Sequence, residues 1–202
     1  MKKKQLEIDI VSDVVCPWCV VGFLKLQQAI DNVKREHDIE INITWQPFEL
    51  APDLSLNGEN LREFLAKKYN SSPDASEAAR NNLTTIGKEL GFDFNFTADM
   101  QRFNTFKAHQ LLAWAKAKGN QTALKLALFK AYFTDHKDIS NEFELALIAE
   151  HVGFNKREVL NALQSEQYEQ PVRNAQNHWI NQGINSAPSS ILQKKSHPRC
   201  PR

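Results

Sequence analysis

The chain has 202 residues, 42% of them hydrophobic and 24% charged, and its 25 basic and 24 acidic side chains leave a formal net charge of +1. This length is enough to bury a sizeable core, and the composition is that of a globular protein. The balanced charge gives no indication of nucleic acid or an anionic membrane as a partner. No run approaches the ~18 uncharged apolar residues that a membrane-spanning helix needs.

The first residues bear on where the protein works. Residues 1–4 are basic, as at the start of a secretory signal, but Glu7 and Asp9 interrupt the apolar run that such a signal requires. We therefore expect a cytoplasmic protein or a mature form whose signal has been removed, and favour the first.

The first 47 residues predict a strand, a helix and a second strand. Apolar and polar residues alternate over 6–10, which is typical of a strand. Apolar residues at helical spacing begin at Pro17 and predict a helix to about Lys34. Alternation returns over 39–45 and ends at Pro47. This βαβ unit should have parallel strands and a right-handed crossover.

Helical spacing then dominates residues 60–182, where seven separate apolar stripes predict seven helices. Gly91, Gly119 and Gly153 each follow such a stripe and are expected to end a helix. No fixed repeat length links the stripes, which argues against a solenoid. Residues 183–192 then predict a turn followed by a short strand.

Two of the three cysteines form the motif Cys16-Pro17-Trp18-Cys19 between the first strand and the first helix. Cys16 would lie at the start of the helix, where free N–H groups favour an anion, with Cys19 one turn deeper. Such positions lower a cysteine pKa to ~3.5–7.5. Cys16 is thus the predicted attacking thiolate and Cys19 the resolving thiol. Pro17 suits the first helical position, and with Trp18 it is expected to tune the redox balance.

A second interpretation of the motif is structural. A lone CxxC can be half of a zinc site, and His197 and Cys200 could supply the other half. A strand followed by CxxC and a helix favours redox chemistry instead, so we predict no metal site.

Several segments, in order, resemble the DsbA-like thioredoxin family, and in particular its FrnE-like branch. The similarity covers about residues 6–192 and is far more specific than CxxC alone. The matching segments are 8–19, 45–50 (WQPFEL), 104–109 (NTFKAH), 128–133 (LFKAYF) and the loop 183–188.

This resemblance implies an α/β, thioredoxin-like fold with a large all-helical insertion domain. The first half of the thioredoxin-like domain would be residues 1–58 and the helical insertion 59–182. Residues 183–202 would be the second half, a cis-proline loop and an atypical short tail.

The resemblance also implies roles for four residues outside the cysteine motif. Pro188 would be cis and face the cysteine pair, and the backbone of Ala187 would pair with an extended substrate segment. His109 and Asn104 match positions near the family's cleft, although a buried histidine bonded to the backbone explains His109 equally well.

Family members exchange disulfides with protein thiols, so protein substrates are the expected partners, with glutathione or a thioredoxin-type protein as reductant. No cofactor is expected beyond the cysteine pair. A glutathione-dependent isomerase or transferase of the same superfamily is the alternative enzyme, but such relatives typically carry serine at the position of Cys16.

Residues 193–202 depart from the family, which continues after the cis-proline strand with another strand and a closing helix. This tail has no apolar alternation. Losing about five large apolar contacts would remove on the order of 10 kcal/mol, comparable with the stability of a whole domain. We therefore expect a chain that is unstable, prone to aggregate or a homodimer.

Overall fold

The computed structural model describes residues 4–194. Its elements in chain order are β1 (Lys4–Ser12), α1 (Pro17–Glu36), β2 (Ile39–Pro47), β3 (Glu59–Asn60), α2 (Leu61–Tyr69), α3 (Pro73–Glu89), β4 (Gln101–Arg102), α4 (Phe106–Lys118), α5 (Gln121–Phe133), α6 (Glu142–His151), α7 (Lys156–Gln164), α8 (Glu169–Asn181) and β5 (Ser189–Lys194).

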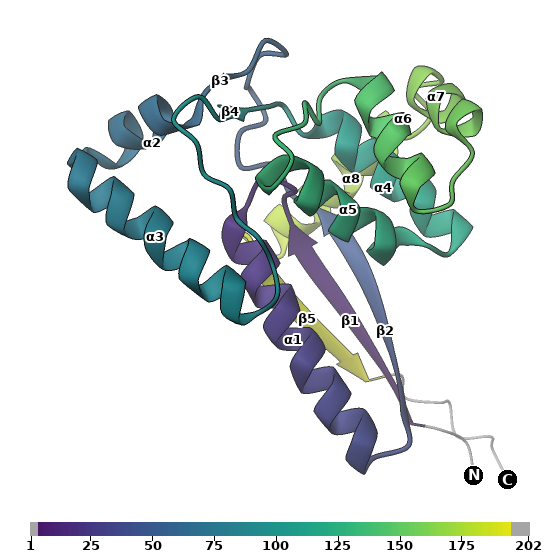
Figure 1. Ribbon diagram of the computed structural model, residues 1–202. Coiled ribbons are helices and arrows are strands. Elements are labelled where there is room, and N and C mark those ends of the chain that lie inside the picture. The colour runs from purple at the N-terminus through teal and green to yellow at the C-terminus, as the bar shows by residue number, and fades with distance from the viewer. Residues whose placement is uncertain (1–3, 195–202) are drawn as a thin grey trace, which may run out of the picture.

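The main sheet has the order β2-β1-β5, with β1 in the centre. β1 pairs in parallel with β2, so that Ile10 lies opposite Trp45, which confirms the parallel βαβ unit. β5 pairs with β1 in the antiparallel sense, and Val11 lies opposite Ser189. Because β1 and β2 run the same way, both of their carboxyl ends point toward α4–α8 (Figure 1).

All seven predicted helices between β2 and β5 are present, as α2 to α8. Three of these helices begin at an asparagine cap: Asn60, Asn141 and Asn155 accept hydrogen bonds from first-turn N–H groups. Gly119 ends α4 with φ of 83°, a conformation that glycine adopts without strain. The two-residue ladder of β3 and β4 was not predicted, because it is too short to show alternation.

These helices form two groups around the sheet (Figure 1). α2 and α3 lie on the side of α1, whereas α4 to α7 gather beyond the ends of β1 and β2. The domain boundaries at residues 58 and 182 stay a prediction.

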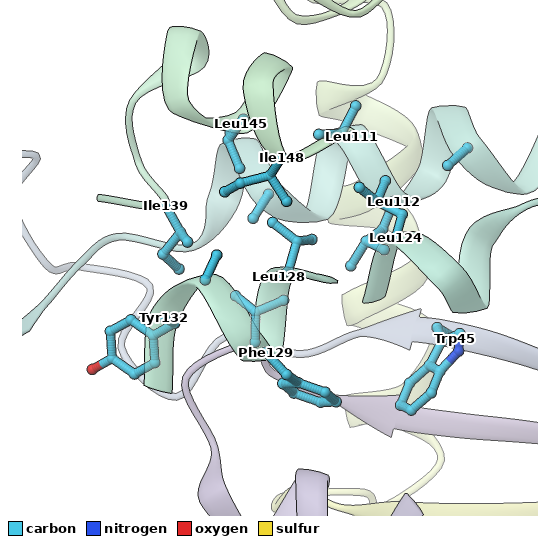
Figure 2. Close-up of a cluster of buried hydrophobic side chains, with 14 of the residues drawn as sticks. Trp45, Leu111, Leu112, Leu124, Leu128, Phe129, Tyr132, Ile139, Leu145 and Ile148 are labelled. Atoms are coloured by element: carbon cyan, nitrogen blue, oxygen red, sulfur yellow. The ribbon is translucent and has the colours of Figure 1, made fainter. Parts of the chain in front are cut away.

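One continuous hydrophobic core joins the sheet to α4–α7. Figure 2 shows leucines of α4 and α5 facing one another, with Phe129 and Trp45 beside the strands. The Trp45 ring lies 4.9 Å from that of Phe23 in α1 and 6.0 Å from that of Phe129 in α5. The helices are therefore part of the same hydrophobic interior as the βαβ unit.

The side chain of Gln121 connects α5 to the outer edge of β2 through hydrogen bonds. Its Oε1 accepts a hydrogen bond from the backbone N–H of Trp45 at 2.9 Å, and its Nε2 donates to the carbonyl of Trp45 at 3.0 Å. The same nitrogen also donates to Leu112 O at 3.1 Å. An amide side chain thus takes the place of a neighbouring strand at this point of the edge.

Residues 195–202, with the zinc candidates His197 and Cys200, lie outside the described residues. The expected short strand after Pro188 is present as β5. Low stability and dimer formation stay predictions. Within residues 4–194, none of the helices has the length and apolar character needed to cross a bilayer.

Candidate active site

Cys16 occupies the N-cap position of α1, as the sequence predicted. Pro17 is the first residue of the helix and is half-buried, and Trp18 projects outward with 50% of its surface exposed. The N–H of Cys19 donates to the carbonyl of Cys16 at 3.0 Å, which brings both residues to the same first turn. Cys16 has 4% of its surface exposed to solvent and Cys19 has none, so Cys16 is the outer cysteine of the pair.

The loop before β5 faces this turn. The Ala187–Pro188 peptide bond is cis, as the resemblance implied. Cys16 Sγ lies 3.6 Å from the carbonyl oxygen of Ala187, to which the thiol can donate. On the other side of the loop, a Cβ at Gly22 of α1 would lie 3.4 Å from Pro188 Cγ. The absence of a side chain at Gly22 therefore leaves space for the proline ring against the helix.

Asp13, at the turn between β1 and α1, connects three segments beneath the cysteine pair. It is 1% exposed, and its two carboxylate oxygens accept from the N–H groups of Val14 and Leu50, both at 2.7 Å. His109 Nε2 lies 3.3 Å from Asp13 Oδ1. Burial alone would raise the pKa of Asp13, but His109, Leu50 and Lys125 together lower it below its ordinary value.

His109 is thus linked through Asp13 to the turn that precedes the cysteine pair, and its place near a substrate cleft stays a prediction. It also lines a cavity of about 240 Å³ enclosed by β2, α4 and α8. Asn104 has a different role, since its amide donates to Leu54 O and accepts from Phe106 N, both at 2.9 Å. Asn104 thus holds a loop and the start of α4.

The two thiols ionise as a coupled pair. Hydrogen bonding with Cys19 and burial raise the pKa of Cys16 far above its ordinary value. Burial also acts to raise the pKa of Cys19, but the hydrogen bond from Cys16, the charge of Lys125 and the hydroxyl of Ser12 outweigh it, so the pKa of Cys19 is lowered. The pair loses its first proton readily and resists losing the second.

The helix terminus acts on both sulfurs, and Lys125 and Ser12 act on the inner one, where they stabilise a negative charge. That Cys16 is the attacking thiolate stays a prediction. Cys16 nevertheless remains the sulfur that has exposed surface and meets the loop.

Lys125, which is 1% exposed, was not predicted as a residue of the site. A signal was present, because Lys125 precedes Leu128, Phe129 and Tyr132 at helical spacing and so lies on the apolar stripe of α5. A lysine in such a stripe is more often found with its end in solvent.

Among the residues that the structure describes, no three His, Cys, Asp or Glu side chains are arranged to hold a metal ion. Both cysteines of the motif are free thiols.

Known proteins identify the architecture. A family model described as a DSBA-like thioredoxin domain matches residues 7–199. The chain belongs to this family. YwbO of Bacillus subtilis, described as uncharacterized, is 25% identical over 188 residues, which are 93% of this chain and 86% of YwbO.

Solved structures agree with this membership of the DsbA-like family. A probable DsbA oxidoreductase from Streptomyces coelicolor superimposes with a TM-score of 0.85 at 26% identity, covering 93% of this chain and 80% of that one. The cytosolic disulfide reductase DsbM from Pseudomonas aeruginosa, solved with GSH, has a TM-score of 0.62 at 14% identity, covering 94% and 89%. The fold is thioredoxin-like, while the FrnE-like branch stays a prediction.

Proposed function

We propose that this protein is a thiol–disulfide oxidoreductase that exchanges disulfides with protein substrates through Cys16 and Cys19. The observation that supports this most strongly is the position of Cys16 Sγ, 3.6 Å from the carbonyl of Ala187 at the cis-proline loop, with the free thiol of Cys19 one turn deeper. Membership of the DsbA-like family favours the same chemistry.

In the reducing direction, the exchange begins from the singly ionised pair, which holds one proton and one negative charge. The proton passes from Cys16 to Cys19 along their hydrogen bond, and the Cys16 thiolate attacks one sulfur of the substrate disulfide. That bond breaks, a mixed disulfide forms, and the departing substrate thiolate takes the proton of Cys19.

Cys19, now a thiolate, attacks Cys16 Sγ and breaks the mixed disulfide. The second substrate sulfur leaves with the electron pair and takes a proton from water. The substrate has gained two electrons and two protons, one from the pair and one from solvent, and the cysteines have formed a disulfide. The reverse sequence oxidises a substrate dithiol.

The groups around Cys16 suit an extended polypeptide. The backbone of Ala187 offers hydrogen bonds to an added strand, and the exposed ring of Trp18 offers apolar surface beside it. A protein substrate would thus be held on both sides of the attacking sulfur.

Glutathione or a thioredoxin-type protein would return the pair to its starting state. DsbM was solved with GSH, which makes glutathione the first reductant to test. A cytoplasmic location, where glutathione keeps thiols reduced, fits this cycle.

The test is reduction of insulin disulfides by the wild type and by Cys16→Ser, Cys19→Ser and Cys200→Ser. Cys16→Ser should abolish activity, and Cys19→Ser should accumulate mixed disulfides because it lacks the resolving thiol. Cys200→Ser, the matched cysteine control, should leave the rate within about twofold. Equal rates in all four proteins would refute the mechanism.

A further inference from the structure

Lys125 of α5 is buried in the core, at 1% exposure. Its Nζ lies 4.9 Å from the ring centroid of Phe129 and 5.3 Å from that of Trp45, at distances that allow cation–π attraction. Aromatic faces replace only part of the hydration that an ammonium loses on burial. The two cation–π contacts alone therefore do not explain why a lysine is buried here.

The ionisable groups near Lys125 explain its burial, because several of them can carry negative charge. The Trp45 ring beside its ammonium lies 4.9 Å from the ring of Phe23, one turn after Cys19 in α1. Lys125 interacts electrostatically with Cys19 and Cys16 in α1 and with Asp13 in the preceding turn. Asp13 is in turn held by His109 of α4, and the buried phenol of Tyr132, on α5 itself, also feels the charge of Asp13.

We propose that Lys125 acts as a positioning residue for the redox pair, holding the negative charge that appears on Cys19 when the disulfide is reduced and taking up a proton in the same event. This rests on the proposed disulfide exchange. It makes Lys125 the residue of the helical segment that sets how strongly the pair oxidises its substrates.

The proton balance follows from the charges. With the pair reduced, burial lowers the pKa of Lys125 to about 8, although Cys19, Asp13 and Cys16 all act to raise it. Disulfide formation removes the single negative charge of the pair, so the pKa of Lys125 falls further and the lysine releases its proton more readily.

Reduction then proceeds without a net change of charge in the site. A substrate dithiol transfers two electrons to the Cys16–Cys19 disulfide, the S–S bond breaks, and the substrate forms its own disulfide. One of the two protons that the substrate releases stays on the thiol of the pair. The other goes to the neutral amine of Lys125, leaving an ammonium beside the thiolate.

The test compares Lys125→Met, which keeps the length of the side chain without its charge, with Lys130→Met as matched control. Lys130 lies on the same helix but is exposed and paired with Asp135. In Lys125→Met the pKa of the pair, read from the pH dependence of iodoacetamide alkylation, should rise by about one unit or more.

The redox equilibrium between the cysteine pair and glutathione should change together with this pKa. The ratio of reduced to oxidised pair in Lys125→Met should fall about tenfold, which corresponds to about 30 mV toward a stronger reductant. The difference from wild type should shrink as the pH rises above about 8, where Lys125 of the wild type loses its charge. Lys130→Met should match the wild type throughout.

A purely structural lysine would alter stability alone, so an unchanged alkylation pKa and glutathione equilibrium in folded Lys125→Met would refute the proposal. If the variant does not fold, NMR titration of the Lys125 amine in the wild type decides, because the proposal requires a lower pKa in the oxidised form and fails if the two forms agree. Both readouts work without turnover, so they remain informative even if insulin reduction shows the proposed function to be wrong.

Discussion

Asp13→Asn tests whether the carboxylate beneath the cysteine pair holds the site together. Asp13 accepts two backbone N–H groups at 2.7 Å, from Val14 and Leu50, through its two separate oxygens. Asparagine has nearly the same shape but only one acceptor oxygen, so its NH₂ group would face one of these donors. Hydrogen bonds to a charged group contribute roughly 1.5–3 kcal/mol each. Losing one, and weakening the other, should lower the free energy of unfolding by about 3 kcal/mol.

The measurement is urea unfolding of the reduced protein at several pH values. Because the pKa of Asp13 in the folded protein lies below the ordinary value of 3.8, its ionised form stabilises the fold above that value. This stabilisation is lost as the pH falls through the lower folded pKa. The wild type should therefore exceed Asp13→Asn by a constant amount between about pH 5 and 8, and the gap should narrow below about pH 4.

Asp31→Asn is the matched control, since this α1 carboxylate is exposed and accepts from Gln27 Nε2 at 3.0 Å. It should stay within about 0.5 kcal/mol of the wild type. An Asp13→Asn protein as stable as this control near neutral pH, or a gap that persists unchanged into acid, would contradict the reasoning.

Two further substitutions test the surroundings of the site. Gln121→Leu leaves the backbone N–H and carbonyl of buried Trp45 unpaired and should lower the unfolding free energy by about 2–4 kcal/mol, whereas the exposed Gln170→Leu should not; equal urea midpoints would refute this. Gly22→Val should push the Pro188 ring away from α1 and reduce the rate of insulin reduction at least tenfold. Gly22→Ala should keep most of that rate, because its Cβ only touches the ring at 3.4 Å. Equal losses of rate in both variants would show that side-chain size is not the cause.

The main elements could be predicted because each shows a regular period in the sequence. The alternation in β1 and β2 reflects the pleat of a sheet, and the stripes of α4 and α5 reflect a buried helix face. The cysteine pair could likewise be predicted from local signals, because its two-residue spacing and its place between a strand and a helix are visible in the sequence. The cis peptide at Pro188 was expected from family resemblance alone.

The electrostatics of the site could not be predicted, because they arise between residues far apart in the chain. Two of the three groups that contact the Asp13 carboxylate are 37 and 96 positions away, on Leu50 and His109. Lys125 lies on an apolar stripe, but only the packing of α5 on the sheet turns its end inward. The start of α1 acts on both sulfurs alike, so the effect of Lys125 on Cys19 could not be seen in the sequence.

The separation between Cys16 and its loop affects how the protein is made. Ala187, whose carbonyl meets the outer sulfur, follows it by 171 positions. At ~5–20 residues added per second, a growing chain would present both thiols for roughly 10 to 30 s before this loop leaves the ribosome. During that interval small oxidants would meet cysteines without their covering loop. Newly made molecules would thus depend on the surrounding thiol pool to emerge with the pair reduced.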